Sequence, residues 1–144
     1  MSNIDFNQFV RALGDGVIVC DAGGAITVWN ASATRIFGFT EEEAIGQSLD
    51  LIIPERQRQR HWDGYHKTME TGITRYGADL LRVPALHKEG KPLSIAFTVA
   101  MLHNPDGTVS AIVAIVRDET SRWSEERALK AKVAQMEAAA NTAA

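Results

Sequence analysis

Residues 111–120, Ala-Ile-Val-Ala-Ile-Val-Arg-Asp-Glu-Thr, decide the fold of this chain. The first six form an unbroken apolar run rich in β-branched residues, which predicts a buried β-strand. The run ends in charged residues and passes directly into residues 121–140, whose composition predicts a helix. A short polar joint between a core strand and a projecting helix suits the transfer of a structural change from one to the other. The pattern therefore favours a sensor module.

Length and composition predict one globular domain. The chain has 144 residues, of which 45% are hydrophobic and 23% charged, and a chain of this size can bury about two-thirds of its unfolded surface. A net charge of −3 gives no electrostatic reason to expect a nucleic-acid partner. No apolar stretch approaches the roughly 18 residues of a membrane span, and no secretory signal is visible. We therefore expect a cytoplasmic protein with no membrane partner.

The residues show no pattern typical of catalysis. Cys20 is the only cysteine, so an intrachain disulfide and a cysteine-cluster metal site are excluded. Its apolar surroundings predict a buried, inert thiol. Nucleophile elbows, phosphate loops and dinucleotide fingerprints are missing from the sequence. We do not expect an enzyme.

The remaining segments alternate in a definite order along the chain. We expect an N-terminal amphipathic helix within residues 1–15, a core over 16–120, and a C-terminal signalling or coiled-coil helix over 121–144. The expected elements are a helix over 2–13 with a Ser2–Asp5 capping box, strands over 17–20 and 26–29, a helix over 31–37 capped by Asn30, a short helix opened by a Thr40–Glu43 capping box, an apolar segment over 49–53, a helix over 55–71 ended by Gly72, strands over 78–86, 93–102 and 109–117, and the exit helix.

The exit helix carries apolar residues at coiled-coil spacing over about two heptads. These residues are Leu129, Val133, Met136 and Ala140. Two heptads are too short to pair stably alone. We therefore expect this helix to dock on a partner or to continue into a longer helix; the alternative is a solvated tail.

Four strings resemble the PAS domain family in the right order and on the right elements. They are Gly16–Asp21, Trp29–Phe39, Glu43–Gly46 and Val116–Thr120. The resemblance implies an α+β PAS fold, with a five-stranded antiparallel sheet, helices on one face, and a cavity between them. It also implies that Asp118 and Thr120 couple the sheet to the exit helix. We place Trp123 with them in the signal relay, packed on the outer face of the sheet or on a second protomer.

Within the family, residues 53–61 resemble the corresponding helix of the haem-PAS oxygen sensors of rhizobial nitrogen-fixation kinases. His61 falls where that group places its proximal iron ligand. Tyr65 resembles a tyrosine that follows the ligand there, although the spacing here is one residue longer. Neutral imidazole is a suitable iron ligand. A His61 that hydrogen-bonds inside the fold or lies on the surface is the alternative.

The distal side of the haem-PAS pattern matches only in part. Phe97 and Val99 match strand positions that line the oxygen pocket of that group. Its distal arginine falls at Leu81, with Arg82 one residue away. A shift of one residue on a strand turns the side chain to the other face. Flavin is not expected, because the flavin branch carries a reactive cysteine on its helix and residues 49–71 contain none.

The leading hypothesis is a PAS sensory module that binds a small ligand or cofactor and relays its state through the C-terminal helix. One alternative is a haem-binding gas or redox sensor with His61 as axial ligand. Another is a ligand-free homodimerisation scaffold. The expected partners are a second copy and an output domain, such as a histidine kinase or cyclase, in the same chain or a separate one. The N-terminal helix offers one dimer surface at Phe6, Phe9, Val10 and Leu13, unless it packs over its own sheet.

Overall fold

A five-stranded antiparallel sheet forms the centre of the computed structural model, which describes residues 3–73 and 79–143. The spatial order of the strands is β2-β1-β5-β4-β3. The strands are β1 (Gly16–Asp21), β2 (Ile26–Trp29), β3 (Leu81–Leu86), β4 (Pro92–His103) and β5 (Val109–Asp118). The first and last strands in sequence therefore lie side by side at the centre. The PAS-type sheet expected from the sequence is confirmed.

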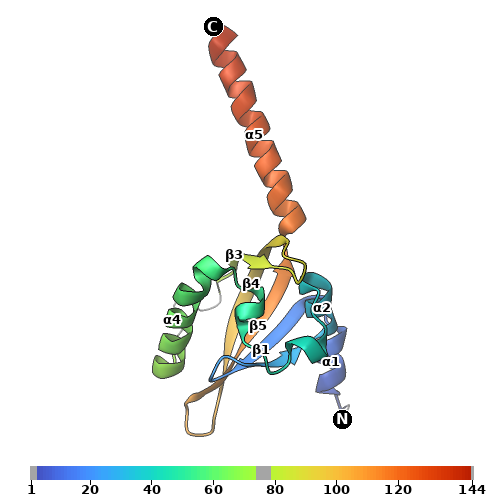
Figure 1. Cartoon of the computed structure of the whole chain (residues 1–144), viewed down its shortest axis with the longest axis vertical. Helices are drawn as coiled ribbons and strands as arrows, with labels where there is room; N and C mark the ends of the chain where they lie inside the picture. The colour runs from blue at the N-terminus through green and yellow to red at the C-terminus, as the bar shows by residue number, and fades with distance from the viewer. Residues whose placement is uncertain (1–2, 74–78, 144) are drawn as a thin grey trace.

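Helices cover one face of this sheet, as expected (Figure 1). They are α2 (Ala31–Phe37), α3 (Glu41–Ala44), the 3-10 helix η1 (Leu49–Ile52) and α4 (Glu55–Thr71). Two further helices flank the core, α1 (Phe6–Ala12) before it and α5 (Thr120–Ala143) after it. Figure 1 shows α5 leaving the end of β5 and projecting away from the sheet. Within the described residues, no helix is both long and apolar enough to cross a membrane.

Short-range capping signals position several helices as the sequence predicted. Asn30 caps α2 by accepting a hydrogen bond of 3.0 Å from the Ala33 amide. Thr40 and Glu43 form a reciprocal capping box at the start of α3. Gly72 ends α4 with a positive φ of 70°, a conformation that glycine adopts without steric cost.

Two predicted boundaries were wrong. The N-terminal helix begins at Phe6, because the Asp5 carboxylate accepts hydrogen bonds from the amides of Asn7 and Gln8 and is itself the N-cap. Ser2, the predicted cap, lies outside the described residues. Strand β3 begins at Leu81, and residue 78, where this strand was expected to begin, is also outside the described part. The strand is confined to the residues that pair with β4, from Leu81 opposite Phe97 to Leu86 opposite Pro92.

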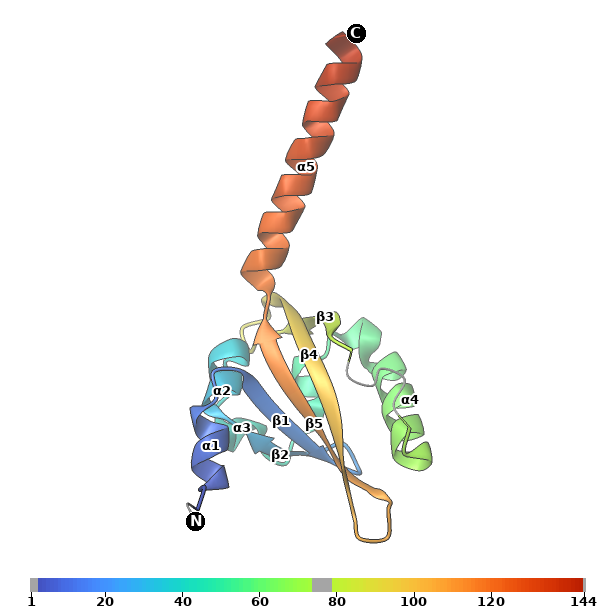
Figure 2. The same ribbon diagram turned by 180° about the vertical axis from the view of Figure 1, so that it is seen from behind.

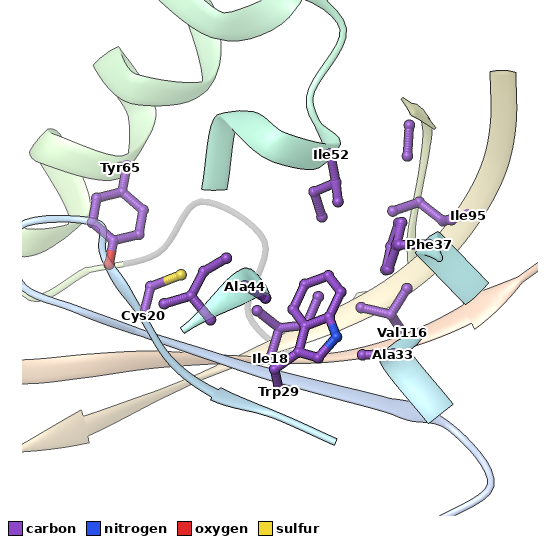
Figure 3. Close-up of a cluster of buried hydrophobic side chains, with 12 residues drawn as sticks. Ile18, Cys20, Trp29, Ala33, Phe37, Ala44, Ile52, Tyr65, Ile95 and Val116 are labelled. Carbon is purple, nitrogen blue, oxygen red and sulfur yellow. The ribbon is translucent and has the colours of Figure 1, made fainter. Parts of the chain in front are cut away.

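The core lies between the sheet and α2, α3 and η1 (Figure 3). Its largest fully buried side chains include Trp29, Phe37 and Ile18. The rings of Trp29 and Phe37 lie 5.6 Å apart. The Trp29 indole donates hydrogen bonds to the Thr34 hydroxyl and the Phe39 carbonyl, so its polar atom is satisfied inside an apolar cluster.

The other face of the sheet is apolar and open. In the central strand β5, the residues between Val109 and Val116 are only partly buried, so the expectation of a fully buried strand was wrong. In the described part of the chain, no helix lies across this face (Figure 2). Its partly or fully exposed side chains include Val19, Thr98, Ala100, Val113 and Ile115. A run of this composition suits a strand that has a layer on both sides.

Candidate functional site

Helix α4 is attached to the first strand by a tyrosine. Tyr65 is 7% exposed and points from α4 toward β1, close to Cys20 (Figure 3). Its hydroxyl donates a hydrogen bond to the carbonyl of Asp21. Burial raises the pKa of Tyr65 above its ordinary value, so this phenol stays protonated and remains a donor. Tyr65, predicted as a cofactor contact, thus also anchors α4 to the sheet.

Trp62 attaches the same helix to a neighbouring segment. Its indole nitrogen donates a hydrogen bond of 2.7 Å to the carboxylate of Asp50, in η1. The rings of Trp62 and Tyr65 meet edge to face at 5.2 Å. One turn of α4 therefore contacts both the end of β1 and η1.

His61 lies on the sheet-facing side of α4, one turn before Tyr65. Its side chain is partly buried, and its ring meets the Trp62 ring edge to face at 4.6 Å. Its Nδ1 is buried and has no hydrogen-bond partner. Burial lowers the pKa of the His61 imidazole, against an opposing effect of the nearby Asp50 carboxylate. The imidazole of His61 is thus partly buried, with Nδ1 lacking a hydrogen-bond partner.

The helix-covered face of the sheet contains the three strand residues predicted as cofactor contacts. Leu81 pairs with Phe97, and Val99 pairs with Ala114. Directly opposed residues in antiparallel strands share a face, and Phe97 and Ala114 pack against the buried core. Leu81, Phe97 and Val99 therefore all face the helix side.

Arg82 is on the other face of the sheet. It pairs with Ala96, is exposed, and lies beside α5. A distal arginine on β3, which the haem-PAS pattern would require, is therefore not supplied by this residue.

The exit joint is a compact set of hydrogen bonds between the start of α5 and the start of β4. The Thr120 hydroxyl accepts a hydrogen bond of 3.0 Å from the Ser94 amide and donates one of 2.5 Å to the Asp118 carboxylate. The same carboxylate accepts from the Thr120 amide at 2.9 Å. In addition, the Glu119 amide donates to the Ser94 carbonyl at 2.8 Å. The joint thus contains Asp118 and Thr120, as expected, together with Ser94, which sequence reasoning missed.

Trp123 lies beyond this joint, in the first turn of α5. It is 49% exposed, and the guanidinium of Arg127 stacks over its ring at 5.2 Å. It borders a groove of about 300 Å³ at the base of α5. The other residues that line this groove are Arg82, Ser94, Glu119, Arg122 and Glu126.

A buried amide connects α1 to the core, and sequence reasoning recognised it only as a helix cap. Asn30 is 2% exposed. Its Oδ1 accepts from the Val17 amide at 2.9 Å, and its Nδ2 donates to the carbonyls of Val10 and Asp15 at 2.9 and 3.1 Å. No local pattern reveals these three contacts, because their partners lie 13 to 20 residues away.

A surface ion pair joins the two ends of the core. Arg117 donates two hydrogen bonds of 3.2 Å to the carboxylate of Asp15, 102 residues earlier. These residues flank Gly16 and Val116, which are paired across β1 and β5. The chain therefore enters and leaves the sheet at neighbouring points.

Two further observations concern the chemistry of the site. Over the residues that the structure describes, no group of three or more His, Cys, Asp or Glu side chains could hold a metal ion. Cys20 is buried, and burial is the main reason that its pKa rises to about 12. Its thiol is therefore protonated and unreactive at neutral pH. What the described residues offer is a partly buried imidazole on α4, an apolar helix-side face of β3, β4 and β5, and a hydrogen-bonded exit.

Comparisons with known proteins identify similar domains. A family model described as the PAS fold matches residues 4–118. Sensor protein FixL of Bradyrhizobium diazoefficiens is 41% identical over 58 residues, which are 40% of this chain and 11% of that protein. The signal transduction histidine-protein kinase AtoS of Escherichia coli is 27% identical over 118 residues, which are 82% of this chain and 18% of that protein. The chain thus spans a small part of the length of these relatives.

A solved structure agrees with the architecture. The crystal structure of the PAS domain of a protein from Colwellia psychrerythraea superposes with a TM-score of 0.70 at 21% identity, covering 81% of this chain and 95% of that one. At this identity the likeness concerns the fold alone.

Proposed function

The chain belongs to the PAS domain family, and on this basis we propose that it is the sensory module of a larger signal-transduction protein. The module binds a small ligand or cofactor between α4 and the inner face of β3, β4 and β5. It passes the resulting change to an output domain through α5. Relatives that include a sensor protein and a histidine kinase support this assignment.

One observation supports the relay, namely that the residues at the start of α5 are hydrogen-bonded to Ser94 of β4. Ser94, which bonds Thr120 and Glu119, lies beside Ile95 and close to Phe97 in the same strand. Ile95 and Phe97 face the core. A ligand that displaces the inner side of β4 therefore shifts Ser94 and with it the first turn of α5.

The relay is tested in the full-length signalling protein with an Asp118→Ala substitution. The Asp118 carboxylate lies at the joint and not on the ligand wall, so output should become insensitive to ligand while affinity stays nearly unchanged. Gln135→Ala, on the exposed helix beyond the joint, is the control. Equal loss of affinity and output in Asp118→Ala would contradict the relay.

Haem is a second candidate ligand, favoured by His61. A buried imidazole nitrogen without a hydrogen bond is costly, and coordination by this ring would give it a role in an otherwise apolar site. His61 would hold the iron, with Tyr65 beside it and Leu81, Phe97 and Val99 opposite. Haem would supply reversible gas binding or a redox change.

The absorption spectrum of the purified protein tests whether the ligand is haem. The protein is purified from cells supplied with iron and a haem precursor, beside His61→Ala and the control His66→Ala, which alters an exposed histidine of the same helix. A Soret band that disappears only in His61→Ala would support haem. A featureless spectrum would contradict it. Native mass spectrometry then distinguishes a colourless ligand from an empty domain, and the empty domain would favour the scaffold alternative.

We also propose that the module is a homodimer. The open face of the sheet is bordered by α1, whose Phe6 and Phe9 are 72% and 51% exposed. The open sheet face, the apolar side of α1 and the exposed α5 together form more apolar surface than one protomer covers by itself. Phe9→Asp, or deletion of 121–144, should shift the protein toward monomer in sedimentation velocity, whereas Gln8→Asp, next to Phe9 on α1, should not. An unchanged sedimentation coefficient per protomer mass would contradict this interface.

A further inference from the structure

The groove at the base of α5 lies on the outer face of the sheet, away from the proposed ligand site. Arg82 and Ser94 line it from β3 and β4. A smaller hollow of about 140 Å³ lies beside it on α5, and Trp123 and Glu126 line both. Since Ser94 also forms the exit joint, any molecule held in the groove touches the sheet and α5 at the point where they are connected.

One side of α5 contributes most of this surface. Trp123, Arg127 and Lys130 are spaced at i, i+4 and i+7, which places them on the same side of a helix. All three are exposed. Lys132 follows Trp123 by about two and a half helical turns and therefore lies on the opposite side.

Positive charge predominates around the two hollows. Both carboxylates in their lining contact Arg122, at 3.7 and 3.2 Å. Arg82, Arg127 and Lys130, here called the groove cations, form no ion pair with another residue of the described part of the chain. With four cations and two carboxylates in the lining, the surface favours an anionic partner.

The length of this surface indicates an extended chain as the occupant. From Trp123 to Lys130 the helix advances by about 10 Å, and Arg82 lies on a different element, across the groove from α5. A β-strand-like segment advances by about 3.3 Å per residue, so several consecutive residues are needed to reach all the groove cations. The half-exposed indole of Trp123 offers a contact for an aromatic side chain within that segment.

We infer that this groove binds an extended acidic segment of a partner protein, with an aromatic side chain against Trp123 and carboxylates beside the groove cations. The bound segment contacts β3 on one side of the exit joint and α5 on the other. It therefore restricts the movement of α5 relative to the sheet. This site lies on the outer face and requires no ligand on the inner face.

Peptide binding to the full chain tests the charge contacts. The probe is a fluorescein-labelled peptide of sequence Asp-Glu-Phe-Glu-Asp, followed by fluorescence anisotropy. Arg82→Glu and Lys130→Glu should each weaken binding at least about fivefold, because each turns an attraction into a repulsion. Lys132→Glu makes the same change of charge on the opposite side of α5 and should weaken binding less than about twofold.

A second peptide tests the aromatic contact. The wild-type protein should bind Asp-Glu-Phe-Glu-Asp at least about threefold more tightly than Asp-Glu-Gly-Glu-Asp. Trp123→Ala should abolish this preference and leave the affinity for the glycine peptide nearly unchanged. Leu129→Ala, which removes another exposed apolar side chain of α5, should keep the preference.

Hydrogen exchange tests the restriction of α5. The Trp123 amide donates a hydrogen bond of 2.8 Å to the Glu119 carbonyl in the first turn of the helix. Saturation with the phenylalanine peptide should slow exchange at this amide at least about threefold, and exchange at Val133, farther along α5, should not change. Unchanged exchange at Trp123 in the bound state would overturn the restriction of α5.

Every other outcome also decides the assignment. Lack of binding, or equal weakening by Arg82→Glu and Lys132→Glu, would overturn the groove as the site. Equal affinity for a thymidine oligonucleotide of the same charge would identify a nucleic-acid surface and overturn a peptide partner. Loss of peptide binding as the protein concentration rises would show that a second copy fills the groove. None of these failures would affect the Soret test of His61 or the Asp118→Ala test, so the proposed function would stand.

Discussion

Trp62 lies so close to Gly24 that no side chain fits between them: a Cβ on Gly24 would fall 2.4 Å from the Trp62 ring. Gly24 also has a positive φ of 89°. The indole cannot withdraw freely, because it is hydrogen-bonded to Asp50. Helix α4 therefore packs, through Trp62, directly against the backbone of the turn between β1 and β2.

Gly24→Ala should destabilise the protein by about 2–4 kcal/mol, since backbone strain and overpacking add. The measurement is urea unfolding followed by tryptophan fluorescence. Gly46→Ala is the matched control, because Gly46 has a similar φ of 85° but open space around its Cα, and it should cost only about 1 kcal/mol. Equal losses in the two variants would show that the Trp62 contact is unimportant.

Asn30→Ala should be among the most damaging single changes in the core. It leaves the buried amides of Val17 and Ala33 without their acceptor and frees the carbonyls of Val10 and Asp15, at a cost of about 2–4 kcal/mol. Because two of these bonds hold the last turn of α1 and the segment after it, limited proteolysis near Leu13 should also accelerate. Asn104→Ala, which removes one exposed hydrogen bond to Thr108, serves as comparison, and a similar loss there would argue against a special role for Asn30.

The buried imidazole of His61 makes stability depend on pH. Burial lowers its pKa from the ordinary value of 6.5, so between the folded and unfolded values the unfolded chain binds more protons. Stability should therefore fall as pH decreases below about 6.5, by less than about 1 kcal/mol for this partly exposed group. Unfolding curves from pH 8 to pH 5 should be flatter for His61→Gln than for wild type, whereas the exposed His103→Gln should follow wild type. Parallel curves for all three proteins would refute this.

Thr120→Val should loosen the exit joint without unfolding the core. The substitution removes the acceptor of the Ser94 amide and the donor to Asp118, at a cost of about 1–2 kcal/mol. Hydrogen exchange at the Ser94 and Trp123 amides should increase, while exchange in β1 stays slow. Thr120→Ser keeps the hydroxyl and should resemble wild type; identical exchange in the valine variant would mean that the hydroxyl does not hold the joint.

Features set by neighbouring residues were predictable from the sequence. The caps at Asn30 and Thr40 and the glycine at the end of α4 depend on contacts within a few residues, and each was placed correctly. The order of strands and helices followed from the same local signals and from the family resemblance.

Features set by distant residues were not predictable in this way. The exposure of β5 depends on which face the helices cover, and the sequence of a strand does not record this. The close contact of Trp62 with Gly24 and the hydrogen bond from Tyr65 to Asp21 join segments far apart in the chain. Ser94 went unnoticed because its role is carried by its backbone, which any residue except proline provides.

The pairing of Asp15 with Arg117, next to that of Gly16 with Val116, has a practical consequence for engineering. Because the polypeptide crosses into and out of the core at adjacent points, the core can be exchanged as a cassette with two nearby splice sites. A core transferred between these positions carries its own Asp15–Arg117 ion pair. The distance between the recipient's two flanking helices then stays the same. A foreign core joined there would connect to α1 and α5 through the same two positions.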